Sequence, residues 1–380
     1  MRKNAAVTGG IASGDPTLES LGGWPSVLGR LAAGTDLGAV EAGVAMTEVL
    51  EGNATPAQIA AFVFGLRCKG ETVEEMTGLV AAMLAASERV TVDPDLAARL
   101  IDTCGTGGDR SGTINVSTIA ALIVAGAGVP VCKHGGRAAS SRAGSADVLE
   151  ALGVVIDLGP DGVARCIREA GIGFCFAPRY HPAMRHAIPI RRELGVPTAF
   201  NFLGPLANPA RVRRQVVGVG DPAMAPKMVR VLAAGGADHV LVVHGTDGLD
   251  EISTTGPSVI HQYRHDESGG RFEVHEIDPA TLGLRRASLA DLRGGDADTN
   301  AELARRVLAG EAGPHHDIVV LNAAAGLLAA DRCADLAEGV EMASQVIADG
   351  RAADALQQLV SVSQAAAADT SVRRPAGGRS

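Results

Sequence analysis

Apolar residues recur at helical spacing in the first quarter of the chain, from Trp24 to about Val90. Residues 55–58 and 72–75 each begin with threonine and end with glutamine or glutamate, the pattern of a capping box at a helix N-terminus. A third helix is expected over 38–50. The pattern predicts a small unit of short helices without strands, whose Met and Leu stripes face a core or a subunit interface.

From residue 97 onward, short apolar runs alternate with helical segments, which is typical of a parallel sheet with crossover helices. The expected strands are a short one at Leu100 and Ile101, then 128–132, 154–158, 173–177, 215–219 and 239–243. Two further strands, 258–265 and 271–277, predict an antiparallel hairpin near a sheet edge. Closing helices are expected over 318–330 and 338–348. The predicted fold class is α/β: a small N-terminal helical domain plus a larger α/β domain with a mostly parallel central sheet.

The same patterns predict the domain boundaries. The polar or Ala-, Ser- and Gly-bearing ends, 1–20 and 364–380, are expected to be disordered tails. A helical insertion within 180–207 is expected to pack on the N-terminal helices. The predicted domains are the helical domain, 21–95, and the α/β domain, 96–179 together with 208–363.

Composition limits the class of function. The 380 residues are 46% hydrophobic with few aromatic side chains, so a core of Ala, Val, Leu and Ile is expected. A net charge of -9 argues against a nucleic-acid binder, which carries a basic excess. The six cysteines are scattered without a C-x-x-C pair, which favours reduced thiols. With neither a signal peptide nor a long apolar run, we expect a cytoplasmic protein without a membrane segment.

The segment 102–109, Asp-Thr-Cys-Gly-Thr-Gly-Gly-Asp, is the first candidate for chemistry, because it lies between a predicted strand and an apolar helix. Glycines let backbone N–H groups approach an anion, and a helix N-terminus attracts phosphate. Asn115, Ser117 and Thr118 stand where they can cap that helix or reach a phosphate oxygen or a hydrated metal ion. Phosphate binding is the favoured interpretation and a tight turn the alternative, since the standard nucleotide motifs do not match. Cys104 is expected to be a small buried side chain.

A second polar segment, 133–141, also follows a predicted strand and is expected at the carboxyl edge of the sheet, where α/β proteins bind ligands. Lys133 and Arg137 stand among glycines and serines there. Charge-assisted donors in this arrangement favour a cradle for a polyanion over a solvated basic loop.

A third polar segment, 244–253, contains the adjacent carboxylates Asp250 and Glu251 directly after a strand. Such a pair suits a hard cation bound partly through water, and a surface acidic loop is the alternative. His244 is expected to be a core histidine without a chemical role. In the helical insertion, Arg191 is a candidate partner for a substrate carboxylate, with a surface ion pair to Glu193 as the alternative.

These motifs together resemble a known family. G-T-G-G-D, N-V-S-T, K-H-G-x-R-A-x-S-S, F-N-x-L-G-P-L-x-N-P and D-G-L-D-E-I-S occur in this order, and the chain is similar to the anthranilate phosphoribosyltransferases over about residues 24–360. The resemblance implies transfer of the phosphoribosyl group of 5-phosphoribosyl 1-pyrophosphate to the amine of anthranilate, with two Mg²⁺ ions, in tryptophan biosynthesis. It also implies a homodimer formed through the helical domain. Pyrimidine nucleoside phosphorylases share this architecture, but the acidic pair favours a pyrophosphate–metal site.

The resemblance also implies roles for individual residues. The acceptor anthranilate would contact Gly105, Gly136 and Arg191, and the metal ions would be bound by Ser117, Asp250 and Glu251. The donor would be bound by Gly105, Gly108, Asp109, Thr113, Asn115, Val116, Ser117, Thr118, Lys133, His134, Gly135, Gly136, Arg137, Ala138, Ala139, Ser140, Ser141 and Ser145. No covalent nucleophile is expected, because catalysis would rest on positioning and electrostatics.

One position departs from the family pattern. Gly136 stands where the family usually has asparagine, whose side chain contacts the acceptor. Three consequences are open: anthranilate still binds through Arg191, a different or bulkier aromatic amine is the acceptor, or activity is weakened. A non-catalytic relative that binds nucleic acid is a further alternative, opposed by the net charge and by the presence of Ser117, Asp250 and Glu251.

Overall fold

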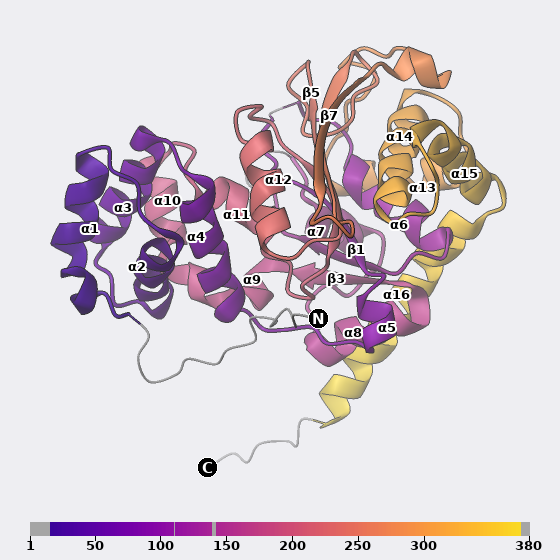
Figure 1. Ribbon diagram of the computed structural model, residues 1–380. Coiled ribbons are helices and arrows are strands. Elements are labelled where there is room, and N and C mark those ends of the chain that lie inside the picture. The colour runs from indigo at the N-terminus through magenta and orange to yellow at the C-terminus, as the bar shows by residue number, and fades with distance from the viewer. Residues whose placement is uncertain (1–15, 110, 139–141, 374–380) are drawn as a thin grey trace.

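The computed structural model describes residues 16–109, 111–138 and 142–373. Figure 1 shows an N-terminal group of helices beside a larger part built around a twisted sheet. Within the described residues, no helix combines the length and the apolar character needed to cross a membrane.

Four helices form the N-terminal part: α1 (Gly23–Ala32), α2 (Ala39–Glu51), α3 (Pro56–Lys69) and α4 (Val73–Ala85). Both predicted capping boxes are confirmed. The Gln58 N–H donates to Thr55 Oγ1 at 3.3 Å while the Thr55 N–H donates to Gln58 Oε1 at 2.8 Å, and Thr72 and Glu75 repeat the arrangement. These reciprocal bonds satisfy N–H groups that the first helical turn leaves without a partner.

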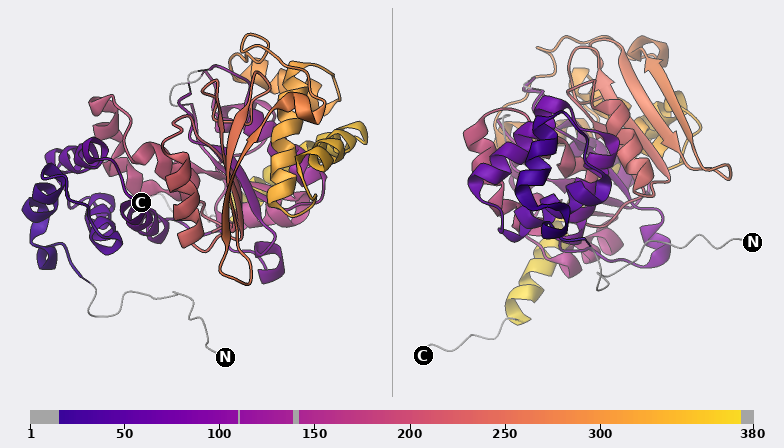
Figure 2. Two further views of the ribbon diagram at one scale, coloured as in Figure 1. Left: turned by 45° about the horizontal axis from the view of Figure 1, so that its top comes forward. Right: turned by 60° about the vertical axis from the view of Figure 1, so that its left-hand side comes forward.

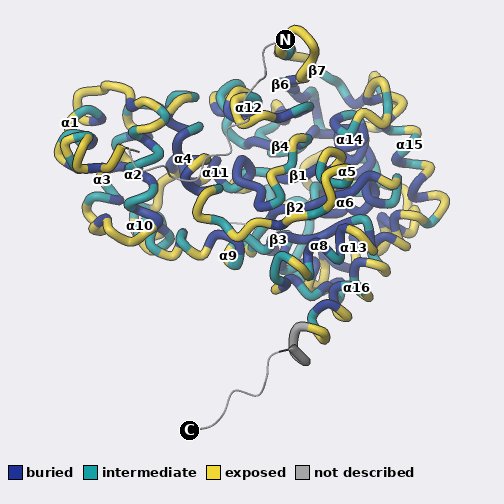
Figure 3. The backbone as a smooth tube through the Cα atoms, turned by 60° about the horizontal axis from the view of Figure 1, so that its bottom comes forward, coloured by how far each residue is buried: buried dark blue, intermediate teal, exposed yellow. Residues whose placement is uncertain are grey.

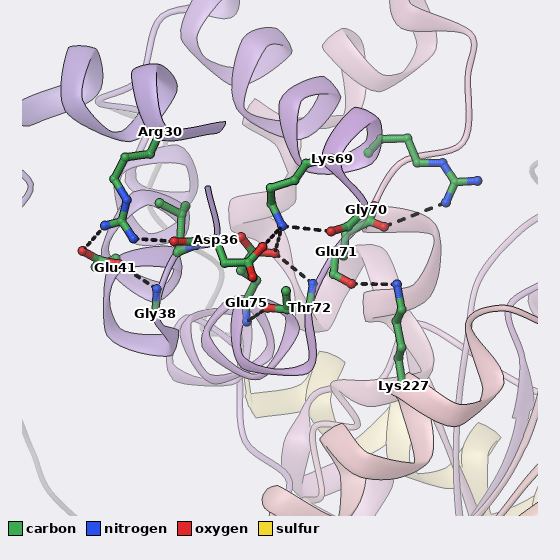
Figure 4. Close-up of polar contacts among 12 residues, drawn as sticks. Arg30, Asp36, Gly38, Glu41, Lys69, Gly70, Glu71, Thr72, Glu75 and Lys227 are labelled. Carbon is green, nitrogen blue, oxygen red and sulfur yellow. Dashed lines mark hydrogen bonds and ion pairs between the residues drawn. The ribbon is translucent and has the colours of Figure 1, made fainter. Parts of the chain in front are cut away.

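A buried carboxylate ties the connections of this helical part together. Figure 4 shows Lys69 directed toward Glu75 and Asp36, with Nζ 3.0 Å from Glu75 Oε2 and 2.6 Å from Asp36 Oδ1. On the other side of the α3–α4 connection, Lys227 Nζ donates to the Glu71 carbonyl at 2.7 Å. Because Lys227 lies on α12 (Ala225–Ala234), this bond joins the helical part to the sheet-containing part.

In the part of the chain that the structure describes, the central sheet has seven strands: β1 (Ile101–Gly105), β2 (Val131–Gly135), β3 (Ile172–Phe176), β4 (Arg214–Gly218), β5 (His239–Gly245), β6 (Ser258–Arg264) and β7 (Arg271–Ile277). Their order is β3-β2-β1-β4-β5-β6-β7; the first five are parallel, and β6 and β7 are antiparallel. The predicted fold class is confirmed. β2 begins three residues later than predicted because Pro130, which has no N–H to donate to a neighbouring strand, precedes it.

Helices cover both faces of the sheet, and alternate residues of β5 show how. Val240 and Val242 belong to the core shared with α12, α11 (Phe200–Leu206) and the N-terminal helices, whereas Leu241 and Val243 belong to the core on the opposite face. Figures 1 and 2 show the helices on that face, and Figure 3 shows that buried residues gather along the strands and α6. These helices are α6 (Val116–Gly126), α13 (Ala297–Leu308), α14 (Pro314–Ala329), α15 (Leu336–Ala348) and α16 (Arg351–Arg373).

The insertion after β3 forms α9 (Ala177–Tyr180), η2 (Pro182–His186), α10 (Ile188–Leu194) and α11. η2 lies against α2, and α10 lies against α3. Met184, Phe200 and Leu203 share one apolar core with the N-terminal helices. The insertion therefore carries its residues to the boundary between the helical part and the carboxyl edge of the sheet. The remaining short elements are η1 (Glu19–Leu21), α5 (Pro94–Ala97), α7 (Ser145–Ala151), α8 (Pro160–Ala170) and η3 (Pro279–Leu282).

The strand predicted over 154–158 is wrong. Burial does alternate along this segment, as in a strand, but it makes no ladder. Instead the Val155 N–H donates to Ser363 Oγ at 3.1 Å, and Gln364 Nε2 donates to the Gly153 carbonyl at 3.0 Å. Residues of α16, rather than a neighbouring strand, therefore supply these hydrogen-bond partners.

Both predicted tails are shorter than expected. Helix α16 continues to Arg373, and Ala366 is buried against the core, so residues 364–373 are helical rather than disordered. At the other end Leu18 packs into the core of the helical part, and η1 follows it. Residues 1–15 and 374–380 lie outside the described residues. Apolar contacts at Leu18 and Ala366 order segments whose polar composition suggested disorder.

Candidate functional site

Four parallel strands end in glycine at the same edge of the sheet: Gly105 in β1, Gly135 in β2, Gly218 in β4 and Gly245 in β5. β1 and β4 are neighbours, with Gly105 beside Gly218. A Cβ atom at Gly105 would lie 2.4 Å from Asp250 Oδ2, and one at Gly218 would lie 1.6 Å from the Asp250 carbonyl oxygen. Glycine is therefore required at both strand ends because Asp250 lies directly over them.

The glycine loop closes on the same carboxylate. The Gly107 N–H donates to Asp250 Oδ2 at 2.7 Å, and Gly107 and Gly108 both adopt positive φ, of 64° and 82°. Asp109, held by the Ser111 hydroxyl at 2.6 Å, faces Asp250. Burial and the nearby Asp109 together raise the pKa of Asp250 to about 6.

Glu251 lies on the other side of this centre, against the first turn of α6. The Ser117 N–H donates to Glu251 Oε1 at 3.1 Å, and Lys133 Nζ donates to Ser117 Oγ at 3.3 Å and to the Thr103 carbonyl. Burial raises the pKa of Glu251 well above its usual range; Asp250 adds to this shift and Lys133 opposes it. Lys133, itself buried, thus reaches from β2 to the predicted metal ligands.

The donor set fits a hard cation. Burial raises the pKa values of both Asp250 and Glu251, because too little positive charge lies near them to favour the ionised forms. A divalent ion would supply that charge. Within the described residues, no group of three or more His, Cys, Asp or Glu side chains is arranged to hold a metal ion alone. Proteins usually bind Mg²⁺ through one or two carboxylates, with water and phosphate oxygens as the other ligands, and this donor set is compatible with that pattern.

The second predicted loop divides into residues that face the site and residues that do not. A Cβ at Gly135 would lie 2.3 Å from Ser145 Oγ, and Ser145 Oγ donates to the Gly136 carbonyl at 3.3 Å. By contrast, the buried His134 ring pairs through Nδ1 with the Gly204 carbonyl of α11 at 3.0 Å. Burial, with a contribution from His181, lowers the pKa of His134 to about 3, so this ring is neutral.

Arg137 does not join the polyanion cradle in this structure. Its guanidinium pairs with Asp147 at 2.7 Å and Glu150 at 2.5 Å, and lies 5.5 Å from the centre of the Phe176 ring. The Ala138 N–H donates to Asp147 as well, at 3.1 Å. The predicted donor contacts Ala139, Ser140 and Ser141 lie outside the described residues.

The residues that follow the glycine loop have distinct positions. Val116 and Thr118 are buried in the first turn of α6. Thr113 forms an isolated antiparallel bridge with Arg293. Asn115 precedes α6 without capping it through its side chain; its Nδ2 instead donates to the Ala143 carbonyl at 3.1 Å.

Arg191 is partly buried on α10, and burial lowers its pKa. Its guanidinium lies 5.7 Å from the centre of the Phe200 ring. Among the described residues it forms no ion pair, so the alternative pairing with Glu193 is absent from this structure. Arg191 therefore retains a charge that can pair with a bound carboxylate.

The structure confirms that His244 and Cys104 are buried, as expected. His244 is buried and its Nδ1 pairs with the Val219 carbonyl at 2.8 Å. Cys104 is buried in β1, and burial raises the pKa of its thiol well above the usual range, so it is not a reactive thiolate.

Sequence reasoning missed three buried asparagines that hold the site. Asn208 Nδ2 donates to Asp102 and to the Cys132 carbonyl, both at 2.8 Å, and so joins β1 to β2. Asn322 on α14 accepts from the Ile252 N–H and donates to the Ile252 carbonyl, both at 2.9 Å, directly beside Glu251. The third is Asn300. A polar residue in the apolar run of α14 was the available signal for Asn322.

Two family descriptions divide the chain as the fold does: residues 25–87 match the helical bundle domain of a glycosyl transferase family, and residues 97–353 match its α/β domain. Fold and site thus define a two-domain glycosyl transferase. Anthranilate phosphoribosyltransferases of Thermomicrobium roseum and Salinispora arenicola are 53% and 52% identical over 344 and 347 residues, each covering 90% of this chain and 97% of the relative. The chain belongs to the anthranilate phosphoribosyltransferase family.

Solved structures agree with this membership. The crystal structure of anthranilate phosphoribosyltransferase from Thermus thermophilus has a TM-score of 0.82 and 41% identity, covering 89% of this chain and 99% of that one. The enzyme from Saccharomyces cerevisiae in complex with PRPP and Mg has a TM-score of 0.81 and 26% identity, covering 90% and 98%.

Proposed function

We propose that this enzyme transfers the phosphoribosyl group of 5-phosphoribosyl 1-pyrophosphate (PRPP) to the amine of anthranilate, giving N-(5-phosphoribosyl)anthranilate and pyrophosphate. In metabolism this is the second step of tryptophan synthesis from chorismate. The observation that carries the proposal is the convergence of Asp250, Glu251, Ser117 and Lys133 over the glycine ends of β1 and β4. Backbone N–H groups, a cation site and a buried ammonium are the features that a pyrophosphate ester requires.

The donor would lie between the glycine loop and the first turn of α6. Backbone N–H groups of Gly108 and Asp109 and the α6 N-terminus would face its phosphates. Ser117 and Glu251 are adjacent and would hold one Mg²⁺ ion, and Asp250 and Glu251 would hold a second. These ions would neutralise charge that develops on the departing pyrophosphate. The yeast relative crystallised with PRPP and Mg supports this choice of donor and metal.

The acceptor would be oriented by the partly buried Arg191, whose guanidinium would pair with the anthranilate carboxylate. An aromatic amine is unprotonated at neutral pH, so its lone pair attacks C1 of the ribose without a strong base. The chain therefore acts by holding the amine in line with C1 and by stabilising the leaving group.

Gly136 supports a second candidate acceptor. Among the described residues, a Cβ there would meet only Ala177 Cβ, at 3.9 Å, and the backbone has an ordinary φ, so these residues leave the position open. An aminobenzoate larger than anthranilate would use this room. The second candidate function is thus the same phosphoribosyl transfer to a bulkier aromatic amine.

Assembly and location complete the proposal. Val40 on α2 and Phe64 on α3 are exposed apolar side chains of the helical domain, at 60% and 47%, and a dimer formed through this domain would cover such side chains. All six cysteines are free thiols, which is typical of proteins of the reducing cytoplasm.

Fluorescence tests the proposed function directly. Anthranilate consumption is followed with PRPP and magnesium, and again with a chelator in place of the metal. Magnesium-dependent loss of anthranilate is expected. No loss, with PRPP still binding by calorimetry, would favour the bulkier acceptor, and a screen of substituted aminobenzoates would then identify it. Absence of PRPP binding would contradict the whole proposal.

A further inference from the structure

Residues 292–294, from the last third of the chain, pair with residues 112–114, which connect the glycine loop to α6. Thr113 and Arg293 form an antiparallel bridge, the Ile114 N–H donates to the Leu292 carbonyl at 3.2 Å, and the Gly294 N–H donates to the Gly112 carbonyl at 2.9 Å. Residues 292–294 therefore act as a short strand that supports residues 112–114, which include the predicted donor contact Thr113 and directly precede Asn115.

This support ends in a buried asparagine that faces the donor loop. Asn300, 2% exposed on α13, donates through Nδ2 to Asn115 Oδ1 at 2.9 Å and accepts from the Gly295 N–H at 2.7 Å. Asn115 Nδ2 in turn donates to the Ala143 carbonyl at 3.1 Å. A continuous chain of amide hydrogen bonds thus joins α13, the residue before α6 and the Ala143 carbonyl, two residues before α7.

Gly294 leaves the space that the Asn300 side chain occupies. A Cβ at Gly294 would lie 2.4 Å from Asn300 Oδ1, although the φ of Gly294 is ordinary. The glycine is required here by the close approach of the Asn300 side chain rather than by backbone conformation.

We propose that Asn300 is a positioning residue for donor binding, a role that rests on the proposed function. An amide side chain can be turned by half a revolution, which exchanges its donor and its acceptor. Because Asn300 Nδ2 donates to Asn115, it favours the orientation in which Asn115 Oδ1 faces α13. In that orientation Asn115 Nδ2 faces the Ala143 carbonyl and donates to it. Asn115, at the start of α6, and the Ala143 carbonyl are thereby held in one arrangement before the donor arrives, which reduces the ordering cost of binding.

The test is calorimetric titration of PRPP with magnesium into the full chain. Asn300→Asp keeps an acceptor for Gly295 but presents an oxygen to Asn115 Oδ1, and the dissociation constant for PRPP is expected to rise about tenfold, the size of one lost buried hydrogen bond. Gly294→Ala displaces Asn300 without altering it and is expected to give a similar loss. Ser363→Ala, which removes a buried hydrogen bond from the Val155 N–H that does not involve Asn300 or Asn115, is the control with unchanged PRPP affinity.

Coupling separates positioning from general stability. If Asn300 acts through Asn115, the double variant Asn115→Ala with Asn300→Asp binds PRPP about as weakly as Asn115→Ala alone. A folded Asn300→Asp or Gly294→Ala variant with wild-type PRPP affinity would overturn the inference, as would additive losses in the double variant. Wild-type protein that fails to bind PRPP would instead overturn the proposed function itself.

Discussion

Asp250 Oδ2 accepts a hydrogen bond from the Gly107 N–H at 2.7 Å, although the two residues are 143 positions apart in the chain. The bond joins the loop after β5 to the loop after β1, across the end of β4. It forms only because glycines at the ends of β1 and β4 leave space for Asp250. The carboxylate therefore serves both as the support of the glycine loop and as a proposed metal ligand.

Removing the charge of Asp250 while keeping its shape tests the metal assignment. Asp250→Asn retains an oxygen that can accept from the Gly107 N–H but loses one negative charge. Magnesium-dependent kcat is expected to fall by about 10²- to 10³-fold, because the Mg²⁺ ion that would neutralise the charge of the departing pyrophosphate is bound more weakly. Thermal unfolding is expected at an unchanged or higher temperature, since burial disfavours the ionised carboxylate. Wild-type turnover would remove Asp250 from the proposed metal site.

The neighbouring arginines of α10 provide a matched pair. Arg191→Gln is expected to raise the KM for anthranilate by roughly 10- to 100-fold, because a hydrogen-bonded charge pair with the acceptor carboxylate is lost. Arg192→Gln changes the same charge at an exposed position and is expected to leave the KM unaltered. The measurement is steady-state kinetics with anthranilate varied at saturating PRPP. Equal effects of the two substitutions would contradict direct acceptor contact by Arg191.

The open position at Gly136 distinguishes the two candidate acceptors. Gly136→Asn fits without a clash at Cβ, and its amide can donate to an acceptor. If anthranilate is the natural acceptor, its kcat/KM should rise by about two- to tenfold, the contribution of one hydrogen bond. If a bulkier aminobenzoate is used, the same substitution should slow that substrate. Kinetics unchanged with every acceptor would show that position 136 does not touch it.

Two buried histidines predict how stability depends on pH. His134 and His181 have ring centres 5.0 Å apart, and burial lowers their pKa values to about 3 and about 4. The unfolded chain protonates them below about pH 6.5, whereas the native protein keeps both neutral, so the unfolded state binds more protons and the free energy of unfolding falls as pH falls. At pH 4.5 each is expected to cost about 2.5 kcal/mol relative to neutral pH.

Denaturant unfolding between pH 4.5 and pH 7.5 measures this dependence. His181→Gln is expected to remove the contribution of His181, which is about half of the stability that the two histidines together cost on acidification. A pH slope that is the same in wild type and in His181→Gln would show that His181 is not kept neutral in the native protein.

Local sequence determined much of the fold. The capping boxes at Thr55 and Thr72 use partners three residues away, so their bonds depend on no distant segment. The period of apolar residues likewise decided which segments are helices and strands, because amphipathic elements must bury one face. Motif residues such as Asp250 and Glu251 could be recognised as candidate ligands from their types and their place after a strand.

Only the tertiary structure decided which of these residues meet. Val154, Ile156 and Leu158 have the alternation of a strand, yet α16 rather than a strand lies beside them. Arg137 has a side chain suited to binding phosphate, yet its guanidinium forms ion pairs with Asp147 and Glu150 instead. Asn300 carries no local signal of function, and its role arises from a contact with Asn115 across 185 positions. Long-range partners depend on how the sheet and its helices pack, and no short window of sequence contains that information.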